Sequence, residues 1–560
     1  MNRWLCFVVC VLLGLGMVLG GLWVPAHLRA VDDSVIALAG RNSPTLIGQG
    51  LALANESQLG AARLFLEAAQ AEQIPGREQL ASTIGNLAMQ NPGWQVWGGP
   101  EPRLENLAVT NRSNPGSEPV TELVIHLENR QKALDFLRGS SDSGVQELLR
   151  FRAVTNTTLF PPSQSTSGQA LDTALSLCGL LLEEGRLTAG LSNTVVALAS
   201  AANRGGNTQP FEAVLMDLMT LGQRFNWNQL ATFVHRIDDA EALRLQANLV
   251  RNAGVRLPAF FSAVQLSGKP AAVARYLMNF NQTGLSDLGD SLQFGAGGVD
   301  ELLRRNQRLH RSGFGPSLAV SYCLGMPRLA LAGKWLLYLL GGFLLAASAH
   351  FARPPAPALE QPLQVRGFHV VREFLFALGF LLVVVSLSEP FLTQEYQKVE
   401  FPFRLHLPTV GRVVPAEKTG IKPTVMNPPI VLTLLLFFVL QGLLYMASVF
   451  KLAEIHRQRM PPRMKLKLLE NEDHLFDAGL YLGFVGTIVS LILVSMGVIQ
   501  FSLMAAYSST SFGIVFVCVF KIFNLRPARR RLLLEAEAEA ETDPAKPAAT
   551  AAARPLAVHL

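Results

Sequence analysis

Residues 478–501 read AGLYLGFVGTIVSLILVSMGVIQF, a stretch without a single charged side chain. About 20 apolar residues suffice for a helix to cross the hydrocarbon core of a bilayer, so this stretch predicts a membrane-spanning helix. The next stretch, SLMAAYSSTSFGIVFVCVFKIF at residues 502–523, predicts a second one. Only the short sequence IQFS joins the two, which indicates a tight helical hairpin. The hairpin is unusually rich in glycine, serine and threonine.

The other apolar runs place several further helices in a membrane. The chain of 560 residues is 49% hydrophobic and has a mean hydropathy of +0.28, which is high for a soluble protein of this size. The further runs are Trp4–Val24, Leu329–Ala349, Phe374–Leu392 and Ile430–Phe450. Phe374–Leu392 is the weakest run, and a buried globular helix is the alternative for it.

The first apolar run has two interpretations. Arg3 gives it a positive start, and it is long enough for an uncleaved anchor, which we favour. Cleavage after Ala26 or Ala30 would instead make it a signal peptide. In both cases residues 1–30 direct the export of the segment that begins at residue 31.

Basic loops predict the orientation of the membrane helices. The loop KLAEIHRQRMPPRMKLK at 451–467 and the segment KIFNLRPARRR at 521–531 carry dense positive charge. Such segments stay on the cytoplasmic side. The N-terminus and the C-terminus are then cytoplasmic, and residues 31–328 are extracytoplasmic. The expected location is a bacterial inner membrane.

The exported segment is predicted to be helical almost throughout. Stretches such as LGAARLFLEAAQAEQIPG at 59–76 and VDELLRRNQRLH at 299–310 place apolar residues at helical spacing. We interpret His310 as the C-terminal residue of a helix. The helix–turn–helix rhythm is similar to that of helical-repeat folds, although no period of about 34 residues is present. Such arrays offer extended surfaces for protein partners.

No enzyme motif is found. The sequence lacks the HExxH, Walker A and GxSxG patterns and any Cys/His spacing typical of a metal site. His235 with Asp238 and Asp239 is interpreted as a charged helix end. The net charge of +6 is concentrated beside the apolar runs, which argues against nucleic-acid binding. We therefore expect no catalytic residues, no cofactor and no metal.

The hairpin carries the most specific pattern. LGFVGTIVSL at 482–491 resembles the Leu-Gly-Leu-Leu-Gly-Thr-Val-x-Gly-Ile motif of the MotA/TolQ/ExbB proton-channel family, and AYSSTSFGI at 506–514 resembles the family's Ala-Leu-x-x-Thr-Ala-x-Gly-Leu motif. The residues that match are Gly483, Gly486, Thr487, Ala506, Thr510 and Gly513. The resemblance covers about 55 residues and does not extend to the large exported segment.

The resemblance implies a function and a set of site residues. In this family the two helices of five subunits line a pore around single-span partner helices, and a partner aspartate carries protons. Thr487 and Thr510 would then lie on the ion pathway. Ser490 and Ser509 would extend the polar strip, and Gly483, Gly486, Ala506 and Gly513 would serve helix packing. Some members have a glutamate where this chain has Ala505.

The expected fold class is thus mainly α, with a membrane anchor or signal, a large extracytoplasmic domain similar to a helical array, and five transmembrane helices with a short β-like outer loop. The expected domains are 1–30 (anchor or signal), 31–328 (helical), 329–392 (two spans with a basic cytoplasmic loop), 393–429 (outer loop), 430–525 (three spans) and 526–560 (disordered cytoplasmic tail).

The sequence allows three functional hypotheses. The first is an ion-driven, energy-transducing homo-oligomer with a single-span partner that bears an intramembrane aspartate, and an envelope protein partner for the exported domain. The second is a membrane-anchored envelope scaffold or sensor, whose hairpin merely packs. The third, a membrane enzyme or transporter, ranks last because few charged or amide groups lie in the apolar runs. Gln441 is the one amide at mid-membrane, and Lys334 is expected to extend from its helix end to water.

Overall fold

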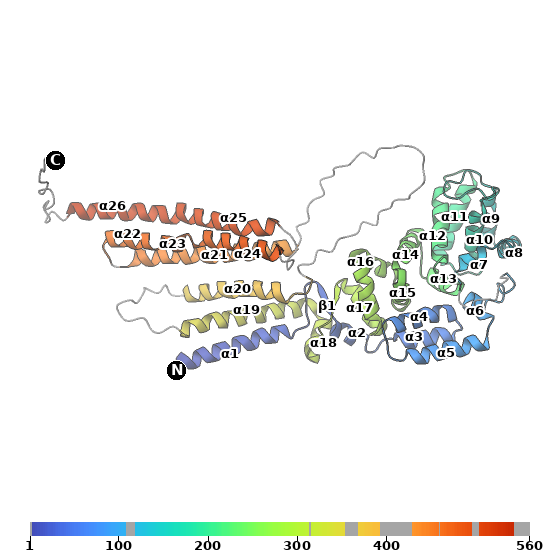
Figure 1. Cartoon of the computed structure of the whole chain (residues 1–560), viewed down its shortest axis with the longest axis horizontal. Coiled ribbons are helices and arrows are strands. Elements are labelled where there is room, and N and C mark those ends of the chain that lie inside the picture. Colours follow the sequence, from blue (N-terminus) through green and yellow to red (C-terminus); the bar gives the residue numbers. More distant parts are fainter. Residues whose placement is uncertain are drawn as a thin grey trace, which may run out of the picture. The chain divides into compact units, whose positions relative to one another are not determined.

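The chain is mainly helical and divides into two compact units (Figure 1). The computed structural model describes residues 3–107, 118–312, 315–352, 368–391, 428–458, 460–495 and 503–542. The helical unit is the part Arg29–Gly325. The membrane unit consists of the residues up to Leu28 together with the described residues from Met326 onward.

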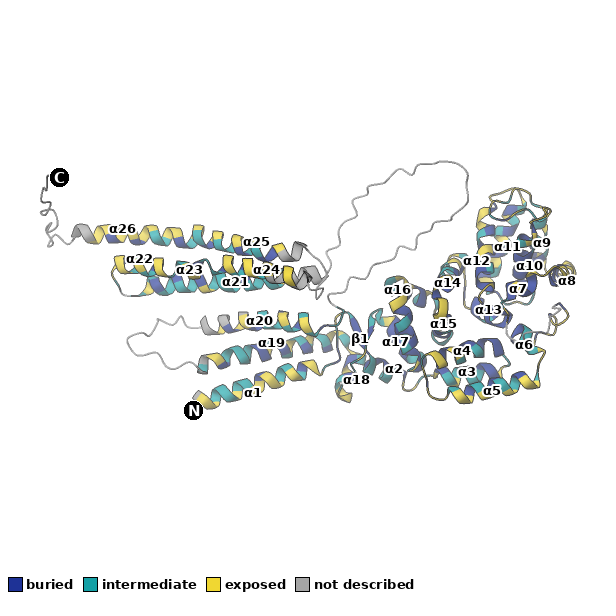
Figure 2. Cartoon of the chain, in the orientation of Figure 1, coloured by how far each residue is buried: buried dark blue, intermediate teal, exposed yellow. Residues whose placement is uncertain are grey.

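The helical unit is built from short helices joined by tight turns. Its helices are α2 (Asp33–Gly40), α3 (Leu46–Asn55), α4 (Leu59–Ala71), α5 (Arg77–Gln90), α6 (Trp94–Trp97), α7 (Val120–Ile125), α8 (Leu127–Arg138), α9 (Ser143–Arg150), α10 (Gln169–Glu183), α11 (Ala189–Asn203), α12 (Gln209–Gly222), α13 (Trp227–Val234), α14 (Ala240–Ala253), α15 (Leu257–Ser267), α16 (Pro270–Leu292), α17 (Gly295–Arg305) and α18 (Ser317–Gly325), with 3₁₀ turns at Phe151–Ala153 and Gly254–Arg256. Successive helices pack against one another around a buried apolar core (Figure 2).

Local signals explain where these helices begin. The Asn226 side chain accepts from the backbone N–H of Gln229, and the Gln229 side chain accepts from the N–H of Asn226 in return, which makes a capping box at the start of α13. Asp239 caps α14 by accepting from the N–H of Ala242. The acidic residues near His235 therefore belong to a helix boundary, as the sequence indicated.

A two-stranded parallel sheet connects the start and the end of the helical unit. Strand β1 (Ala30–Asp32) pairs with β2 (Arg308–His310). The expectation that His310 ends a helix is wrong. Asn306 adopts a left-handed conformation with φ 50°, which ends α17. The chain then extends and pairs with β1.

The membrane unit contains the long apolar helices. Its elements are α1 (Arg3–Leu22), α19 (Pro327–Ala352), α20 (Phe368–Ser388), α21 (Pro428–Arg457), α22 (Pro462–Asn471), α23 (Asp473–Phe476), α24 (Ala478–Ser495), α25 (Leu503–Phe520), a π-helical turn at Lys521–Leu525 and α26 (Arg526–Thr542). Within the unit α1 packs on α19, α19 on α20, α20 on α21, α21 on α25, and α25 on α24.

Among the described residues, four helical segments are long and apolar enough to cross a membrane. They are Trp4–Leu22, Pro327–Ala349, Leu434–Arg457 and Tyr507–Glu539. The described parts of α20 and α24 are apolar but shorter. The prediction of a mainly helical chain is thus confirmed, and four of the six apolar runs coincide with helices that are long and apolar enough to cross a membrane. The expected β-like outer loop at 393–429 lies outside the described residues.

The prediction of a disordered tail is wrong for its first part. Residues Arg526–Thr542 form α26, which packs against α22. Leu532 and Ala536 are buried on one side of α26. Its sequence RPARRRLLLEAEAEAET consists largely of strong helix formers, so propensity and this contact outweigh the low complexity of the segment. Residues 543–560 lie outside the described part.

One buried carboxylate organises the loop before α10. Glu212 on α12 is fully buried and accepts hydrogen bonds from the backbone N–H groups of Thr158, Leu159 and Phe160. Burial alone would raise the pKa of Glu212. The hydrogen bonds from the Thr208 side chain and from these N–H groups outweigh it and hold the pKa below its ordinary value of 4.5.

We predict that Glu212→Gln destabilises this loop by about 1–3 kcal/mol at neutral pH. A neutral amide accepts these N–H groups less strongly, and its NH₂ group cannot accept at all. Because the folded pKa is lowered, the contribution of Glu212 is complete above the unfolded pKa and is lost as the pH falls through the folded pKa. Hydrogen exchange of residues 158–160 should therefore accelerate in the variant at pH 7, and less so near pH 4. Equal exchange at pH 7 would contradict this role.

Candidate functional site

The helices α24 and α25 approach so closely that side chains are excluded at two glycines. A Cβ atom on Gly483 would lie 2.8 Å from the carbonyl oxygen of Ser509. A Cβ atom on Gly513 would lie 2.6 Å from the carbonyl oxygen of Gly479. Real Cβ atoms do not come this close to backbone oxygen, so these two positions require glycine. A Cβ atom on Gly486 would lie 2.5 Å from the hydroxyl oxygen of Ser509. The predicted packing residues Gly483, Gly486 and Gly513 therefore all lie at this interface.

The two threonines of the predicted pathway meet inside the interface. The hydroxyl oxygens of Thr487 and Thr510 are 2.5 Å apart. Each also lies within donating distance of the Gly483 carbonyl oxygen, at 3.1 Å from Thr487 and 3.2 Å from Thr510. Residues 23 positions apart in the sequence thus share one acceptor. Thr487 is only 9% exposed.

The geometry of the three groups allows two proton arrangements. A hydroxyl has one proton to donate. In one arrangement Thr487 donates to Thr510, which donates to the Gly483 carbonyl. In the other, Thr510 donates to Thr487, which donates to the same carbonyl. Both arrangements use the same oxygen positions, so the direction of the hydrogen bonds can reverse without movement of the helices.

Two of the predicted site residues fall outside what the structure describes. The side chains of Ser490 on α24 and Ala506 on α25 are not among the described ones. Ser509 is 1% exposed and lies at the interface. The described large apolar side chains that are exposed on the two helices are Leu480, Tyr481, Phe484, Val485, Ile488, Leu491, Ile492, Tyr507, Ile514, Val515 and Val519. Within one chain, the hydroxyls of Thr487 and Thr510 therefore lie between the two helices, whose described exposed side chains are mostly apolar, with Ser511 an exception.

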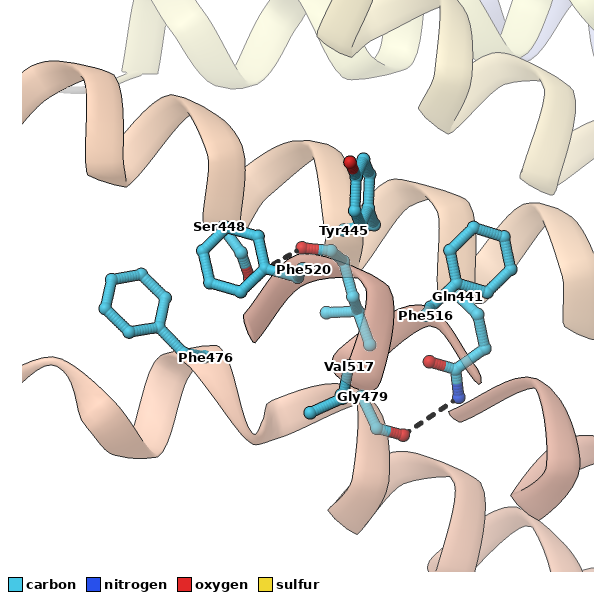
Figure 3. A pocket seen from close by; sticks show the side chains of 9 residues that line it. Gln441, Tyr445, Ser448, Phe476, Gly479, Phe516, Val517 and Phe520 are labelled. Carbon is cyan, nitrogen blue, oxygen red and sulfur yellow. Dashed lines mark hydrogen bonds between the residues drawn. The ribbon is translucent and has the colours of Figure 1, made fainter. Parts of the chain in front are cut away.

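A third helix adds an amide to this site. Gln441 on α21 is 1% exposed and donates from Nε2 to the carbonyl oxygen of Gly479, at 3.0 Å (Figure 3). A carbonyl can only accept, so this bond fixes which end of the amide faces α24. The Cβ atom of a residue other than glycine at position 479 would lie 2.8 Å from Oε1 of Gln441. The glycines of the hairpin therefore allow α21 to approach α24, and they also allow α24 and α25 to approach each other.

The Gln441 oxygen borders a small cavity. Oε1 has no hydrogen-bond partner among the described residues. The cavity has a volume of about 10 Å³, which is close to the minimum that one ordered water needs. It is lined by Gln441, Leu444, Tyr445, Ser448, Phe476, Gly479, Phe516, Val517 and Phe520 (Figure 3). The sequence shows a polar residue at position 441, but it does not show that the side chain of this residue binds the Gly479 carbonyl.

A buried charge pair lies elsewhere in the membrane unit. Lys334 near the start of α19 and Glu389 just after α20 have side chains that are 2% and 1% exposed, with 3.3 Å between Nζ and Oε1. The expectation that Lys334 extends to water is wrong, because a carboxylate is within its reach. The signal for this pair was a basic residue near the start of one apolar helix and an acidic residue just after the end of the next, since two consecutive antiparallel helices bring these ends together.

The described residues contain no group of three or more His, Cys, Asp or Glu side chains arranged to hold a metal ion. The cysteines Cys178 and Cys323 are buried and are not joined in a disulfide. No protein-family model, no curated protein and no solved structure matches the chain.

We predict that Gly513→Ala lowers the stability of the membrane unit by about 1–3 kcal/mol, because the added methyl group overlaps the Gly479 backbone and separates the helices. Gly442→Ala on α21 is the matched control, since a Cβ there meets nothing within 4 Å. Thermal unfolding in detergent measures both. If Gly513→Ala melts no earlier than the control, the close contact at Gly513 is not present in the protein.

Proposed function

We propose that the chain is an ion-driven, energy-transducing subunit of a membrane complex, related to the MotA/TolQ/ExbB proton-channel family. The observation that carries this proposal is the convergence of Thr487 and Thr510. The motif resemblance selects these two residues from separate stretches, and their hydroxyls lie 2.5 Å apart. The proposal assigns the chain no enzymatic activity, no cofactor and no metal.

The proposal places six helices across a bacterial inner membrane. The four long apolar segments support it directly. Helices α20 and α24 complete the set, with 21 and 18 residues in all. Basic segments next to α21 and α25 lie on the cytoplasmic side under this arrangement. The helical unit Arg29–Gly325 is then extracytoplasmic and binds an envelope protein.

The chemistry of the site suits proton transfer at low cost. A fixed charge in the bilayer interior is expensive, whereas a hydroxyl can accept one proton and release another. The reversible hydrogen-bond direction of Thr487 and Thr510 provides such a relay. Neither α24 nor α25 carries a carboxylate. In this proposal the charge carrier is an aspartate on a single-span partner, and several copies of the chain surround it.

A second candidate is a membrane-anchored envelope scaffold. Its support is that the threonine hydroxyls satisfy each other and the Gly483 carbonyl, while the described exteriors of α24 and α25 are mostly apolar. In this alternative, the small residues serve helix packing alone, and the helical unit binds protein partners.

Ion flux through the purified complex separates the two candidates. We predict that vesicles containing the complex, isolated with its co-purifying proteins, conduct protons in a pH-dye assay. Replacing both Thr487 and Thr510 by Val keeps the shape and removes the hydroxyls, and should abolish the flux. Replacing both by Ser retains the hydroxyls and should preserve most of it.

Ser511→Ala is the control variant. Ser511 is exposed on α25 and its hydroxyl donates to the Tyr507 carbonyl of its own helix. This variant should conduct like the wild type. Absence of flux from the wild-type complex, or equal flux from the Val and Ser double variants at equal stability, would contradict the ion pathway and favour the scaffold.

A further inference from the structure

The segment directly after α1 is bound by the charge pair of α19 and α20. Lys334 Nζ donates to the carbonyl oxygen of Ala26 at 2.8 Å. The backbone N–H of Leu28 donates to Oε2 of Glu389 at 2.8 Å. The ring nitrogen Nδ1 of His27 lies 3.3 Å from Lys334 Nζ and 3.8 Å from Glu389 Oε2. Three consecutive residues thus contact the pair.

The charge pair depends on this segment. Both charged side chains are almost fully buried, with 2% exposure for Lys334 and 1% for Glu389. A buried ion pair is stable only when further hydrogen bonds satisfy its remaining donors and acceptors. The Ala26 carbonyl and the Leu28 N–H provide such bonds. Removal of Ala26–Leu28 would leave the ammonium and the carboxylate without them.

Helix α1 itself packs on α19 at backbone distance. A Cβ atom on Gly341 would lie 2.9 Å from the carbonyl oxygen of Gly14. A Cβ atom on Gly21 would lie 2.6 Å from the ring of Tyr338, which is fully buried. Small residues that let two backbones touch are typical of permanent contacts between membrane helices. A helix that is removed after export has no need of such a fit.

The backbone at both candidate cleavage points, after Ala26 and after Ala30, is hydrogen-bonded in the folded protein. The carbonyl of Ala26 is the acceptor for Lys334 in the membrane unit. Within the helical unit, Ala30 and Val31 belong to β1 and pair with Arg308 and Leu309 of β2. Ala30 is 2% exposed and Val31 is fully buried. A protease needs an exposed backbone that can move into its active site, and neither peptide bond offers one.

We infer that the ends of α19 and α20 form a binding site for the Ala26–Leu28 segment, and that the mature protein keeps α1 as a permanent membrane helix. This inference decides between the anchor and the cleaved signal peptide. It rests on the contacts of Lys334, Glu389 and Gly341, and it does not depend on the ion pathway in α24 and α25.

Intact mass spectrometry of the full-length protein, carrying a C-terminal tag and purified from a membrane, is the first test. The expected product is the whole polypeptide of 60.9 kDa plus the tag, with peptides that cover residues 4–24. A mature protein that begins at residue 27 or 31 would overturn the inference.

A variant tests the binding site separately. Lys334→Met should leave Glu389 as a buried, unpaired charge and release Ala26–Leu28, so that added protease cuts residues 23–29 about ten times faster in detergent. Lys521→Met is the control, because its pair with Asp477 is 39% and 27% exposed and lies away from α1. If Lys334→Met does not accumulate, Glu389→Gln, which leaves a neutral acceptor in place, provides the same readout at lower cost in stability. A cutting rate equal to that of the control, in whichever of the two variants accumulates, would contradict the binding site.

Discussion

The membrane unit is governed by one constraint, which is that a polar group surrounded by apolar helices must find its partner inside the chain. Three polar contacts among the described residues of the unit meet it in different ways. Thr487 and Thr510 bind each other and the Gly483 carbonyl. Gln441 donates to the Gly479 carbonyl. Lys334 and Glu389 pair and also bind the backbone after α1. In the first two contacts, glycine makes the carbonyl reachable, because any side chain would block the approach.

The same constraint relates the packing to the proposed activity. A hydroxyl pair that binds one carbonyl is stable in an apolar surrounding, and it is also able to reverse its hydrogen bonds. Close packing and proton relay therefore place similar demands on Thr487 and Thr510. This is why the ion-driven subunit and the scaffold predict the same local structure and differ in what the assembled complex does.

The helical unit is joined to the membrane helices by two connections. Strands β1 and β2 pair, so the start of the helical unit lies beside the segment that precedes its last helix, α18. The corresponding membrane helices, α1 and α19, also pack on each other.

The sequence predicted the features that depend on local pattern. Apolar runs located the helices of the membrane unit, and helical spacing located most of the helical unit. Contacts between residues that are far apart in the sequence were harder to predict. The β1–β2 pair joins residues about 280 positions apart through three-residue strands, which are too short for a periodic signal. Gln441 and Lys334 were visible as polar residues in apolar runs, but their partners depend on which helices become neighbours. The motif resemblance singled out Thr487 and Thr510, but it did not predict that their hydroxyls contact each other.

The most direct measurement on the central claim is native mass spectrometry of the complex, extracted in detergent from its own cells. The ion-driven account predicts five copies of the chain with one or two small proteins, each with a single membrane span that carries an aspartate. A monomer or dimer without such a protein would contradict that account, and Thr487, Thr510 and the glycines around them would then be explained by helix packing alone.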